Sequence, residues 1–501
     1  MNIALISPIM FDLGAYTIAP QLKANGHNVR LLFILELMNT CYAPARLSKR
    51  AISHIATFLK SSDLIGINCL SENYHKTAIF IDSIRAMINK PVIWGGIHAT
   101  LNPEDCIKHV DIVCVGEGEE AIVDLAGRME KNEELNSIQN LIFKPDDAGA
   151  ADIQLRPPVD LNSLKPFDYD LESQFVVEKD LIRNVEERDF KGNFLTYSSR
   201  GCPFKCSYCC NSTMLGKTYI GQKYCRQRDV EPVVEELKVI KNKFPSCKAI
   251  WFNEADFLHG KDHKIIEEFS KKYKAEIGIP FYMWTNPASI KEESIRSLVG
   301  AGFKGVNIGT VNANPEIQES IYNRTATPEL YKRASAILRD NGVSVEYDFI
   351  LCNPYESNAH ILNNINLLRD LPPPFKTVIY SLTYFPETEL YRRAVADGII
   401  KDRGPVSSYI EAAYKTWIFN YETVYLNIVA SLLRGRARKV RFIGKVYGLL
   451  PDSVLGILIS KPFVKFFSLK IFRFTVYPLF GISIKMGFAS IKKISKFQQN
   501  R

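Results

Sequence analysis

The chain has 501 residues, 46% of them hydrophobic, which fits a globular protein with two or three domains. Residues 401–501 hold 18 Lys and Arg against four Asp and Glu, a net charge of +14, whereas the rest of the chain carries −5 of the total of +9. An anionic partner is therefore to be sought at residues 401–501. The chain begins without the basic start of a secretory signal, which indicates that its eleven cysteines are reduced and that the protein is cytoplasmic.

Residues 1–130 alternate between strand and helix patterns, which predicts an α/β domain with a doubly wound parallel sheet. Helical patterns cover residues 16–25, 78–87 and 119–129. Short apolar runs predict strands at residues 3–7, 29–33, 64–68, 92–94 and 112–115.

Two glycine-rich loops follow the last two of these strands. The first contains Gly95, Gly96 and His98, and the second contains Gly116, Glu117 and Gly118. Ligands of such sheets bind beyond the carboxyl ends of the strands, where glycine lets a ligand approach the backbone. Each loop alone is equally explained by ordinary turn chemistry.

Residues 131–190 contain several prolines and are interpreted as a linker with one strand near residue 142. A second alternating series at residues 191–400 predicts six strand–helix units, a partial form of the eight-unit barrel. The expected strands cover residues 194–198, 249–252, 282–284, 306–308, 344–349 and 378–382.

Three cysteines, Cys202, Cys206 and Cys209, follow the first barrel strand at the spacing C-x3-C-x2-C. Three thiolates are one fewer than a full set for a 4Fe–4S cluster, so one iron would stay open for a small molecule. A structural zinc site is the alternative, but zinc would need a fourth ligand. The adjacent Cys210 is expected to point away, and Cys225 has no partner in the sequence.

This motif, with the aromatic Tyr208 before the third cysteine, resembles the signature of the radical S-adenosylmethionine (SAM) superfamily. The two glycine loops resemble those of the cobalamin-binding, flavodoxin-like domain that precedes many radical SAM barrels. Leu13–Ala15 and Asn25–His27 also match that family, whereas the D-x-H-x-x-G loop that supplies a histidine to cobalt is absent. The chain is therefore identified as a divergent member of the cobalamin-binding radical SAM family.

The resemblance implies a role for several polar residues. The residues expected to contact SAM are Tyr208, Glu254, Asn286, Asn312 and Arg324. Glu254 is expected to bind the amino group of SAM, and Arg324 the carboxylate of SAM. A helix-terminal charge for Glu254 and a surface charge for Arg324 are the structural alternatives. Gly95, Gly96, His98, Gly116, Glu117 and Gly118 are expected to contact cobalamin.

The resemblance also implies a reaction. A 4Fe–4S cluster would cleave SAM reductively, with an electron donor such as flavodoxin or ferredoxin, and the resulting radical would abstract a hydrogen atom from the substrate. With cobalamin, methylation of an unactivated carbon of a small-molecule, lipid or natural-product substrate is the leading expectation. Radical cyclisation or rearrangement without methyl transfer, or a non-catalytic iron–sulfur redox sensor, are the alternatives.

Residues 401–501 form a basic and apolar tail that is expected to be helical. No uncharged stretch in it reaches the roughly 18–20 residues that span a bilayer. Basic residues beside aromatic ones favour a helix lying on the inner membrane surface over nucleic-acid binding. A helical cap packed on the barrel is the equally weighted alternative.

Overall fold

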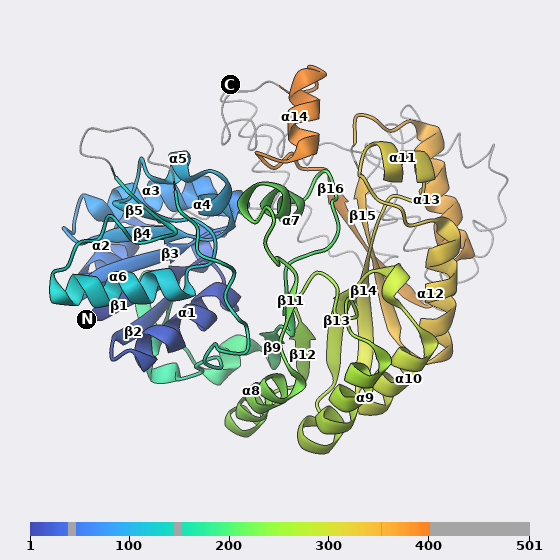
Figure 1. The fold of residues 1–501 in the computed structure, drawn as a ribbon, viewed down its shortest axis with the longest axis horizontal. Helices are drawn as coiled ribbons and strands as arrows, with labels where there is room; N and C mark the ends of the chain where they lie inside the picture. The colour runs from blue at the N-terminus through green and yellow to red at the C-terminus, as the bar shows by residue number, and fades with distance from the viewer. Residues whose placement is uncertain (39–46, 145–152, 352, 401–501) are drawn as a thin grey trace.

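The computed structural model describes residues 1–38, 47–144, 153–351 and 353–400. Two sheets with their covering helices lie side by side, a mixed but mainly parallel sheet formed by the amino-terminal part of the chain and a parallel sheet formed by the later part (Figure 1). This arrangement confirms the predicted fold class. The basic tail at residues 401–501 lies outside the described residues.

The first sheet has the strand order β6-β5-β4-β3-β1-β2-β7-β8. Its central strands are buried and parallel, as their continuous apolar sequences predict. The central strands are β1 (Asn2–Ser7), β2 (Asn28–Phe33), β3 (Leu64–Asn68), β4 (Val92–Gly95) and β5 (Ile112–Cys114). Their order, 5-4-3-1-2, places the start of the chain in the middle of the sheet, as in flavodoxin-like folds.

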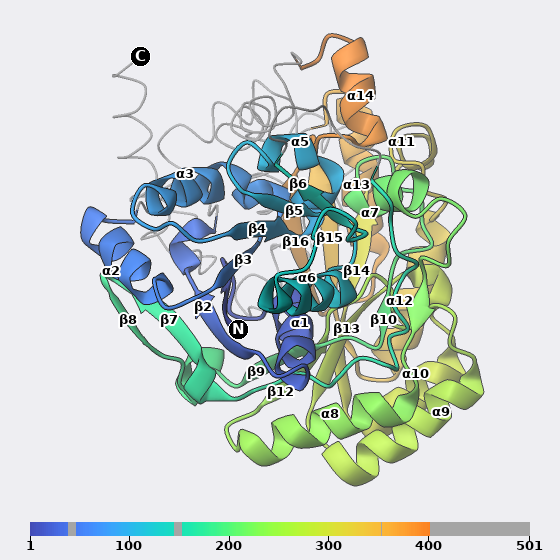
Figure 2. The same ribbon diagram turned by 60° about the vertical axis from the view of Figure 1, so that its left-hand side comes forward.

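Helices cover both faces of this sheet (Figure 2). Side chains of β1 alternate between two apolar clusters: Ile3 and Leu5 belong to the cluster of α1, and Ile6 to the cluster of α2 and α3. Asp12 begins α1, because its side chain accepts hydrogen bonds from the backbone N–H groups of Gly14 and Ala15. The helices of this domain are α1 (Leu13–Ala24), α2 (Lys49–Leu59), α3 (Tyr74–Arg85), α4 (Ile97–Leu101), α5 (Pro103–Cys106) and α6 (Glu119–Lys131).

Residues expected to form a linker add strands to both edges of the first sheet. β6 (Leu141–Phe143) pairs antiparallel with β5, near the single strand that the sequence predicts. At the other edge β7 (Gln174–Glu178) pairs in parallel with β2, and β8 (Leu181–Asn184) pairs antiparallel with β7. The chain between the two sheets therefore packs with the first domain before it enters the second.

The second sheet is parallel and has the order β16-β15-β14-β13-β12-β9. Within the described residues β9 and β16 do not pair, so the six strand–helix units form the partial barrel that the sequence predicts. Its strands are β9 (Asn193–Thr196), β12 (Ala249–Phe252), β13 (Phe281–Thr285), β14 (Phe303–Val311), β15 (Ser344–Leu351) and β16 (Phe375–Ser381). The outer helices are α8 (Val230–Lys243), α9 (His263–Lys272), α10 (Glu292–Ala301), α12 (Pro328–Asp340) and α13 (Asn358–Asp370).

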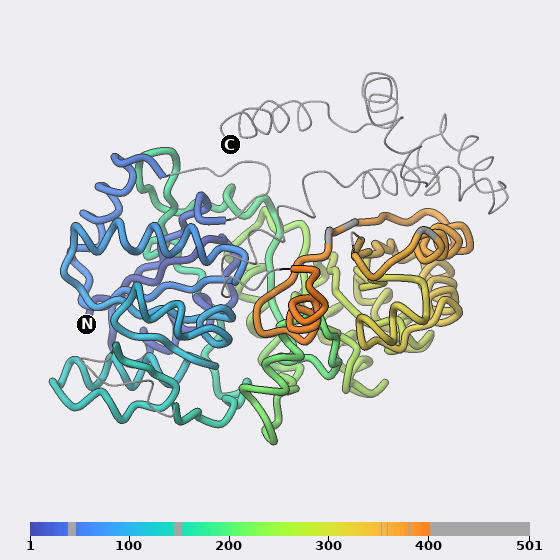
Figure 3. Tube along the Cα trace, turned by 90° about the horizontal axis from the view of Figure 1, so that it is seen from above, coloured from blue at the N-terminus to red at the C-terminus, as the bar shows by residue number. Residues whose placement is uncertain are grey.

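Short elements fill the space at the carboxyl ends of the barrel strands. The antiparallel pair β10 (Ser199–Arg200) and β11 (Arg226–Gln227) and the helix α7 (Cys210–Thr213) lie on the side of the first domain (Figure 1). Helices α11 (Pro315–Ser320) and α14 (Glu389–Ala396) lie at the same end. Seen from above, the trace of α14 stands at the junction between the two sheets (Figure 3).

Helices in the described ranges are all too short or too polar to cross a membrane. The predicted membrane contact rests on residues 401–501, and these lie outside those ranges.

Candidate functional site

A cavity of about 390 Å³ lies between the carboxyl edge of the first sheet and the barrel. With the part that opens to solvent, its empty space is about 1460 Å³. Its size is typical of a ligand site. Both glycine loops line it on one side, and the segment that leads into the cysteine motif lines it on the other. The lining includes Gly95, Gly96, Gly116, Glu117 and Gly118 from the first domain, and Ser199, Arg200, Gly201, Asn211, Met214 and Glu254 from the barrel.

The turn after β4 requires glycine at position 96. Gly96 has a φ of +98°, a conformation that side chains disfavour. A Cβ atom there would lie 2.1 Å from Oδ1 of Asn68 and 2.9 Å from the carbonyl oxygen of Cys69. The backbone of this turn therefore lies directly on the end of β3, which leaves the cavity side of the loop open.

His98 does not line this cavity, in contrast to its predicted contact with cobalamin. Its side chain turns into the core of the first domain, where the ring packs against Tyr74 with centroids 4.3 Å apart. Its Nδ1 lies 3.1 Å from Oγ of Ser71, and Nε2 is buried without a partner in the described structure. Burial lowers the pKa of His98 to about 4, so the ring is neutral at physiological pH.

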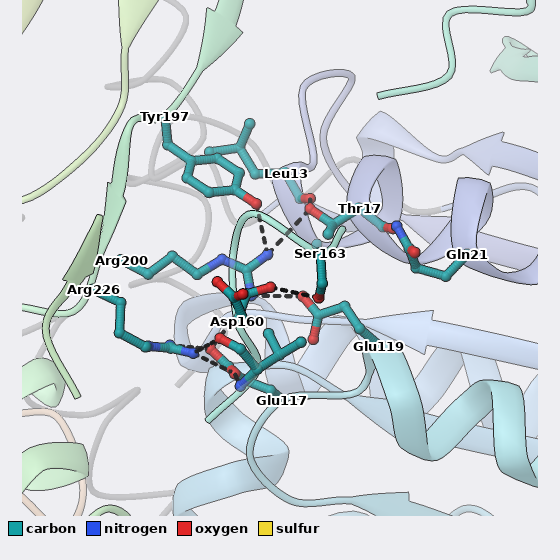
Figure 4. Close-up of polar contacts among 12 residues, drawn as sticks. Leu13, Thr17, Gln21, Glu117, Glu119, Asp160, Ser163, Tyr197, Arg200 and Arg226 are labelled. Atoms are coloured by element: carbon teal, nitrogen blue, oxygen red, sulfur yellow. Dashed lines mark hydrogen bonds and ion pairs between the residues drawn. The ribbon is translucent and has the colours of Figure 1, made fainter. Parts of the chain in front are cut away.

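Glu117 lines the cavity, and its carboxylate also joins the two domains (Figure 4). Arg226 of β11 donates to both carboxylate oxygens, with Nη1 2.9 Å from Oε2. The backbone N–H of Val159 donates to Oε2 at 2.8 Å, and Arg226 in turn donates to the carbonyl oxygen of Val159 at 2.6 Å. Burial opposes ionisation of Glu117, but the hydrogen bonds and charges of the arginines outweigh it and lower its pKa.

Arg200 extends this network toward the cysteine motif. Its Nη1 lies 2.6 Å from Oε1 of Glu119 and 3.3 Å from Oε1 of Glu117. Its Nη2 donates to Oη of Tyr197 at 3.0 Å and to Oγ1 of Thr17 at 3.3 Å (Figure 4). No local sequence pattern indicates the roles of Arg200, Arg226 and Glu119, because their partners are distant in sequence.

The three motif cysteines lie on the loop after β9 and β10. Cys202 and Cys206 are buried and Cys209 is half-buried, and none forms a disulfide. The neighbouring Cys210 thiol lowers the pKa of Cys209 to about 7, whereas burial raises the pKa of Cys202 to about 12.

Backbone contacts hold this loop against the far side of the barrel. Ser207 donates its backbone N–H to the carbonyl oxygen of Tyr322 at 3.1 Å, and its own carbonyl oxygen accepts from Leu390 at 2.9 Å. Tyr208 packs edge-on against Tyr322, with ring centroids 5.4 Å apart. The cysteine loop is thus fixed between the end of α11 and the start of α14, and the ring of Tyr208 is part of the contact with the α11 side.

Glu254 lies at the carboxyl end of β12 and lines the cavity. Its Oε1 accepts hydrogen bonds from the backbone N–H and the hydroxyl of Ser198, at 2.9 and 2.7 Å. Its Oε2 accepts from the hydroxyl of Ser199 and lies 3.8 Å from Nζ of Lys261. In this structure the carboxylate fixes the chain that leads into the cysteine motif, and it remains a candidate for contact with SAM.

Arg324 and Asn286 line a second, smaller cavity beside Cys206. Nη1 of Arg324 lies 3.5 Å from Sγ of Cys206, and Nη2 donates to the carbonyl oxygen of Gly309 at 2.7 Å. Its Nε is buried without a partner in the described part of the chain. Arg324 is therefore a buried cation next to a motif cysteine rather than a surface charge.

Asn312 is fully buried, and both ends of its amide are occupied. Nδ2 donates to Oε1 of Glu356 at 2.7 Å, and Oδ1 accepts from the backbone N–H of Asn314 at 2.7 Å. Val311 before it has a φ of +64°, a strained conformation for a β-branched residue. These bonds give Asn312 a role in shaping this turn, and its amide keeps one N–H and one lone pair beyond them.

Comparison with known proteins identifies two domains. Residues 2–126 match the B12 binding domain and residues 196–368 match the radical SAM superfamily. An anaerobic magnesium-protoporphyrin IX monomethyl ester cyclase of Rubrivivax gelatinosus is 26% identical over 71% of this chain and 61% of that protein, so the chain spans less than two thirds of that relative. A bacteriochlorophyllide d C-8(2)-methyltransferase of Chlorobaculum tepidum is 23% identical over 68% of this chain and 69% of that protein.

Solved structures share the fold of both domains. The radical SAM methyltransferase TsrM from Kitasatospora setae, with cobalamin and a 4Fe–4S cluster, superposes with a TM-score of 0.63 at 17% identity, over 81% of this chain and 79% of that one. The cobalamin-dependent SAM radical enzyme OxsB superposes with a TM-score of 0.66 at 15% identity, over 99% of this chain and 75% of that one.

The residues fit the groups that these domains imply: a 4Fe–4S cluster, SAM and cobalamin. Among the described residues no three His, Cys, Asp or Glu side chains are arranged around a single metal ion. A cubane cluster does not need this, because each cysteine binds a different iron. Three free cysteines beside the buried cation of Arg324 suit an anionic cluster, and the glycine-lined cavity suits a large cofactor.

Proposed function

Because the chain joins a B12-binding domain to a radical SAM domain and so belongs to the radical SAM enzymes that carry both, we propose that it transfers a methyl group to an unactivated carbon of a small molecule. The observation that carries this proposal is the shared cavity. The same space is lined by the glycine loops of the first domain and by the segment before the cysteine motif.

When bound, a 4Fe–4S cluster with SAM supplies a 5′-deoxyadenosyl radical, and cobalamin supplies a carrier for a methyl group. In this chain Cys202, Cys206 and Cys209 would hold the cluster. The loops at Gly95–Gly96 and Gly116–Gly118 would hold cobalamin against the carboxyl edge of the first sheet. Glu254 and the smaller cavity with Asn286 and Arg324 are the proposed contacts for SAM.

The side chains around these sites position groups and exclude water. Arg324 is buried against Cys206, where a cation stabilises negative charge on the sulfur and on a carboxylate nearby. Glu254 fixes Ser198 and Ser199, and so sets the course of the chain into the motif. Tyr208 and Tyr322 close the loop from the side of α11.

Anaerobic reconstitution tests this function. The protein is incubated with SAM carrying a deuterated methyl group and with dithionite, and 5′-deoxyadenosine is measured beside a Cys206→Ala variant. We expect 5′-deoxyadenosine only from the unmodified chain, and deuterated methyl groups on cobalamin extracted from it. No excess of 5′-deoxyadenosine over the variant would contradict the radical step.

Methyl transfer is tested separately from radical formation. The curated relatives include proteins named cyclases as well as methyltransferases, which makes a cyclisation without methyl transfer the second candidate. 5′-Deoxyadenosine without any deuterated methyl group on cobalamin would favour that candidate. A purified chain that neither retains cobalamin nor takes it up would remove the methylation proposal.

A further inference from the structure

Successive side chains of the barrel strand β15 point alternately toward the outer helices and toward the barrel interior. On β15, Val345, Tyr347 and Phe349 belong to the apolar core under the helices. The alternate residues of the strand, Glu346 and Asp348, are half-buried and therefore face the barrel interior.

Three aromatic side chains on β12 and β13 are in contact, and we refer to Trp251, Tyr282 and Trp284 as the aromatic shelf; Trp251 and Tyr282 are stacked, and Trp284 is tilted against Trp251 by 47°. The rings of Trp251 and Tyr282 lie 4.5 Å apart at 16°, and Trp284 lies 5.4 Å from Trp251. All three are half-buried rather than part of the core under the helices. A Cβ atom on Gly305 of β14 would lie 2.9 Å from Tyr282, so this ring lies against the neighbouring strand.

Two carboxylates face the same interior from β15. Glu346 accepts a hydrogen bond from Nδ2 of Asn307 at 2.8 Å. Asp348 has no hydrogen bond within the described ranges, and its Oδ1 atom is buried. Burial, with the charge of Glu346, raises the pKa of Asp348 to about 7. A buried carboxyl group without a hydrogen-bond partner is costly, and a bound donor would remove that cost.

The register of the sheet places these groups near the cysteine motif. Trp284 pairs with Asn307, which pairs with Glu346, and the next inward pair is Gly309 with Asp348. Strands lie about 5 Å apart and residues about 3.3 Å apart along a strand, so the backbone positions of Trp284 and Asp348 are roughly 12 Å apart on either side of β14. Tyr282 pairs with Gly305 and lies two residues further from Asp348. Arg324 donates to the carbonyl oxygen of Gly309 and also contacts Sγ of Cys206, which ties this end of β14 to the cysteine loop.

We propose that the substrate of this barrel carries a planar aromatic ring, which stacks on the aromatic shelf, and a basic nitrogen, which Asp348 binds. The inference rests on the proposed function, because the barrel interior beside the cysteine loop is where that reaction would need its substrate. The ring would extend from Trp284 toward Gly309 of β14, which carries no side chain, whereas Gly305 is already covered by Tyr282. The nitrogen would supply the donor that Asp348 lacks.

Binding of small probes tests this substrate class without any activity. The full-length protein is titrated by ligand-observed NMR with tryptamine, indole-3-propionate and 2-cyclohexylethylamine, which separate the ring from the charge. We expect tryptamine to bind at least about tenfold more tightly than the other two, since a charge-assisted hydrogen bond and aromatic stacking each add to affinity.

Matched variants locate the binding. Asp348→Asn is expected to weaken tryptamine about tenfold and to leave indole-3-propionate unchanged or tighter. Trp284→Leu is expected to weaken both indoles, whereas Tyr282→Phe keeps the ring and the affinity. Asp340→Asn, on the outer helix α12 with Arg339 as its partner, is the control and should change nothing. Thermal unfolding of each variant shows that it is folded.

Two results would overturn the proposal: equal or absent binding of tryptamine and indole-3-propionate, or an Asp348→Asn effect no larger than that of Asp340→Asn. The 5′-deoxyadenosine assay against Cys206→Ala is independent of these titrations. Radical formation without probe discrimination would reject the substrate class alone. Probe discrimination without radical formation would reject the proposed reaction and leave the binding site.

Discussion

Glu117 offers a direct test of how the two domains are joined. Replacing Glu117 by Gln keeps the size of the side chain but removes the charge that pairs with Arg226 and Arg200. The side chains of Glu117 and Arg226 are 19% and 10% exposed, so this pair is largely buried. Removing one partner of a buried pair leaves an uncompensated charge and costs about 3–5 kcal/mol. Because Arg200 retains Glu119 and Arg226 retains the carbonyl oxygen of Val159, we expect a loss of about 3 kcal/mol.

Urea unfolding followed by circular dichroism measures this loss. The control is Glu292→Gln, which removes an exposed helical pair with Arg296, whose side chains are 56% and 70% exposed. That variant should lose less than about 0.5 kcal/mol. High salt should remove the effect of the control pair but leave most of the effect of Glu117→Gln, since buried pairs are screened little.

A double-mutant cycle with Arg226→Gln separates the pair from the rest of the site. We expect a coupling energy of about 1.5 kcal/mol or more between the two positions. One buried apolar cluster contains residues of both sheets, so we expect each variant to unfold in a single transition at a lower urea concentration. A loss below about 1 kcal/mol, or a coupling indistinguishable from zero, would show that the network does not hold the domains together.

Three further changes follow from the structure. His98 has a pKa near 4 in the folded state against about 6.5 in the unfolded state, so its contribution to stability is complete above pH 6.5 and falls as the pH drops toward 4. The unfolding free energy measured in urea should therefore fall between pH 7 and pH 5, and His98→Gln should make that fall smaller by about 2 kcal/mol. Asp348 has the opposite sign, since its pKa is raised to about 7 and the folded state is destabilised as the pH rises from 4 to 7. Asp348→Asn should therefore raise the melting temperature at pH 8, and an unchanged value would contradict the burial argument. Gly96→Ala should cost at least about 2 kcal/mol and reduce cobalamin uptake measured by absorbance, because its Cβ would collide with Asn68 and the backbone of Cys69.

Most of the fold could be predicted from local signals. Parallel strands such as β3 and β12 are short apolar runs between helical patterns, and their parallel pairing follows from the strand–helix alternation. The strand order does not follow from it, because the same alternation gives 5-4-3-1-2 in the first sheet and a sequential order in the second. The edge strands β7 and β8 could not be predicted in the same way. Their sequences are short and partly polar, and they become strands because β7 pairs with β2 and β8 pairs with β7.

The site was predictable only where its residues are close in sequence. The spacing of Cys202, Cys206 and Cys209 identifies the cysteine motif, and the structure places these residues on one loop. In contrast, Glu117 contacts residues 83 and 109 positions away, which no local pattern reveals. Gly95 and Gly96 of the first glycine loop line the cavity, whereas the direction of the His98 side chain depends on its packing against Tyr74, which no local pattern indicates.

The position of Glu117 links the two halves of the proposed chemistry. A cofactor on the glycine loops and a cluster on the cysteine loop can act on one substrate only if their separation is fixed. Glu117 belongs to the second glycine loop, and through Arg200 it contacts the chain two residues before Cys202. Arg226 lies on β11 directly opposite Arg200 of β10, and it contacts the same carboxylate. A single carboxylate thus holds both arginines of one strand pair, and the segment that leads into the cysteines cannot move relative to the cavity without breaking buried charge contacts.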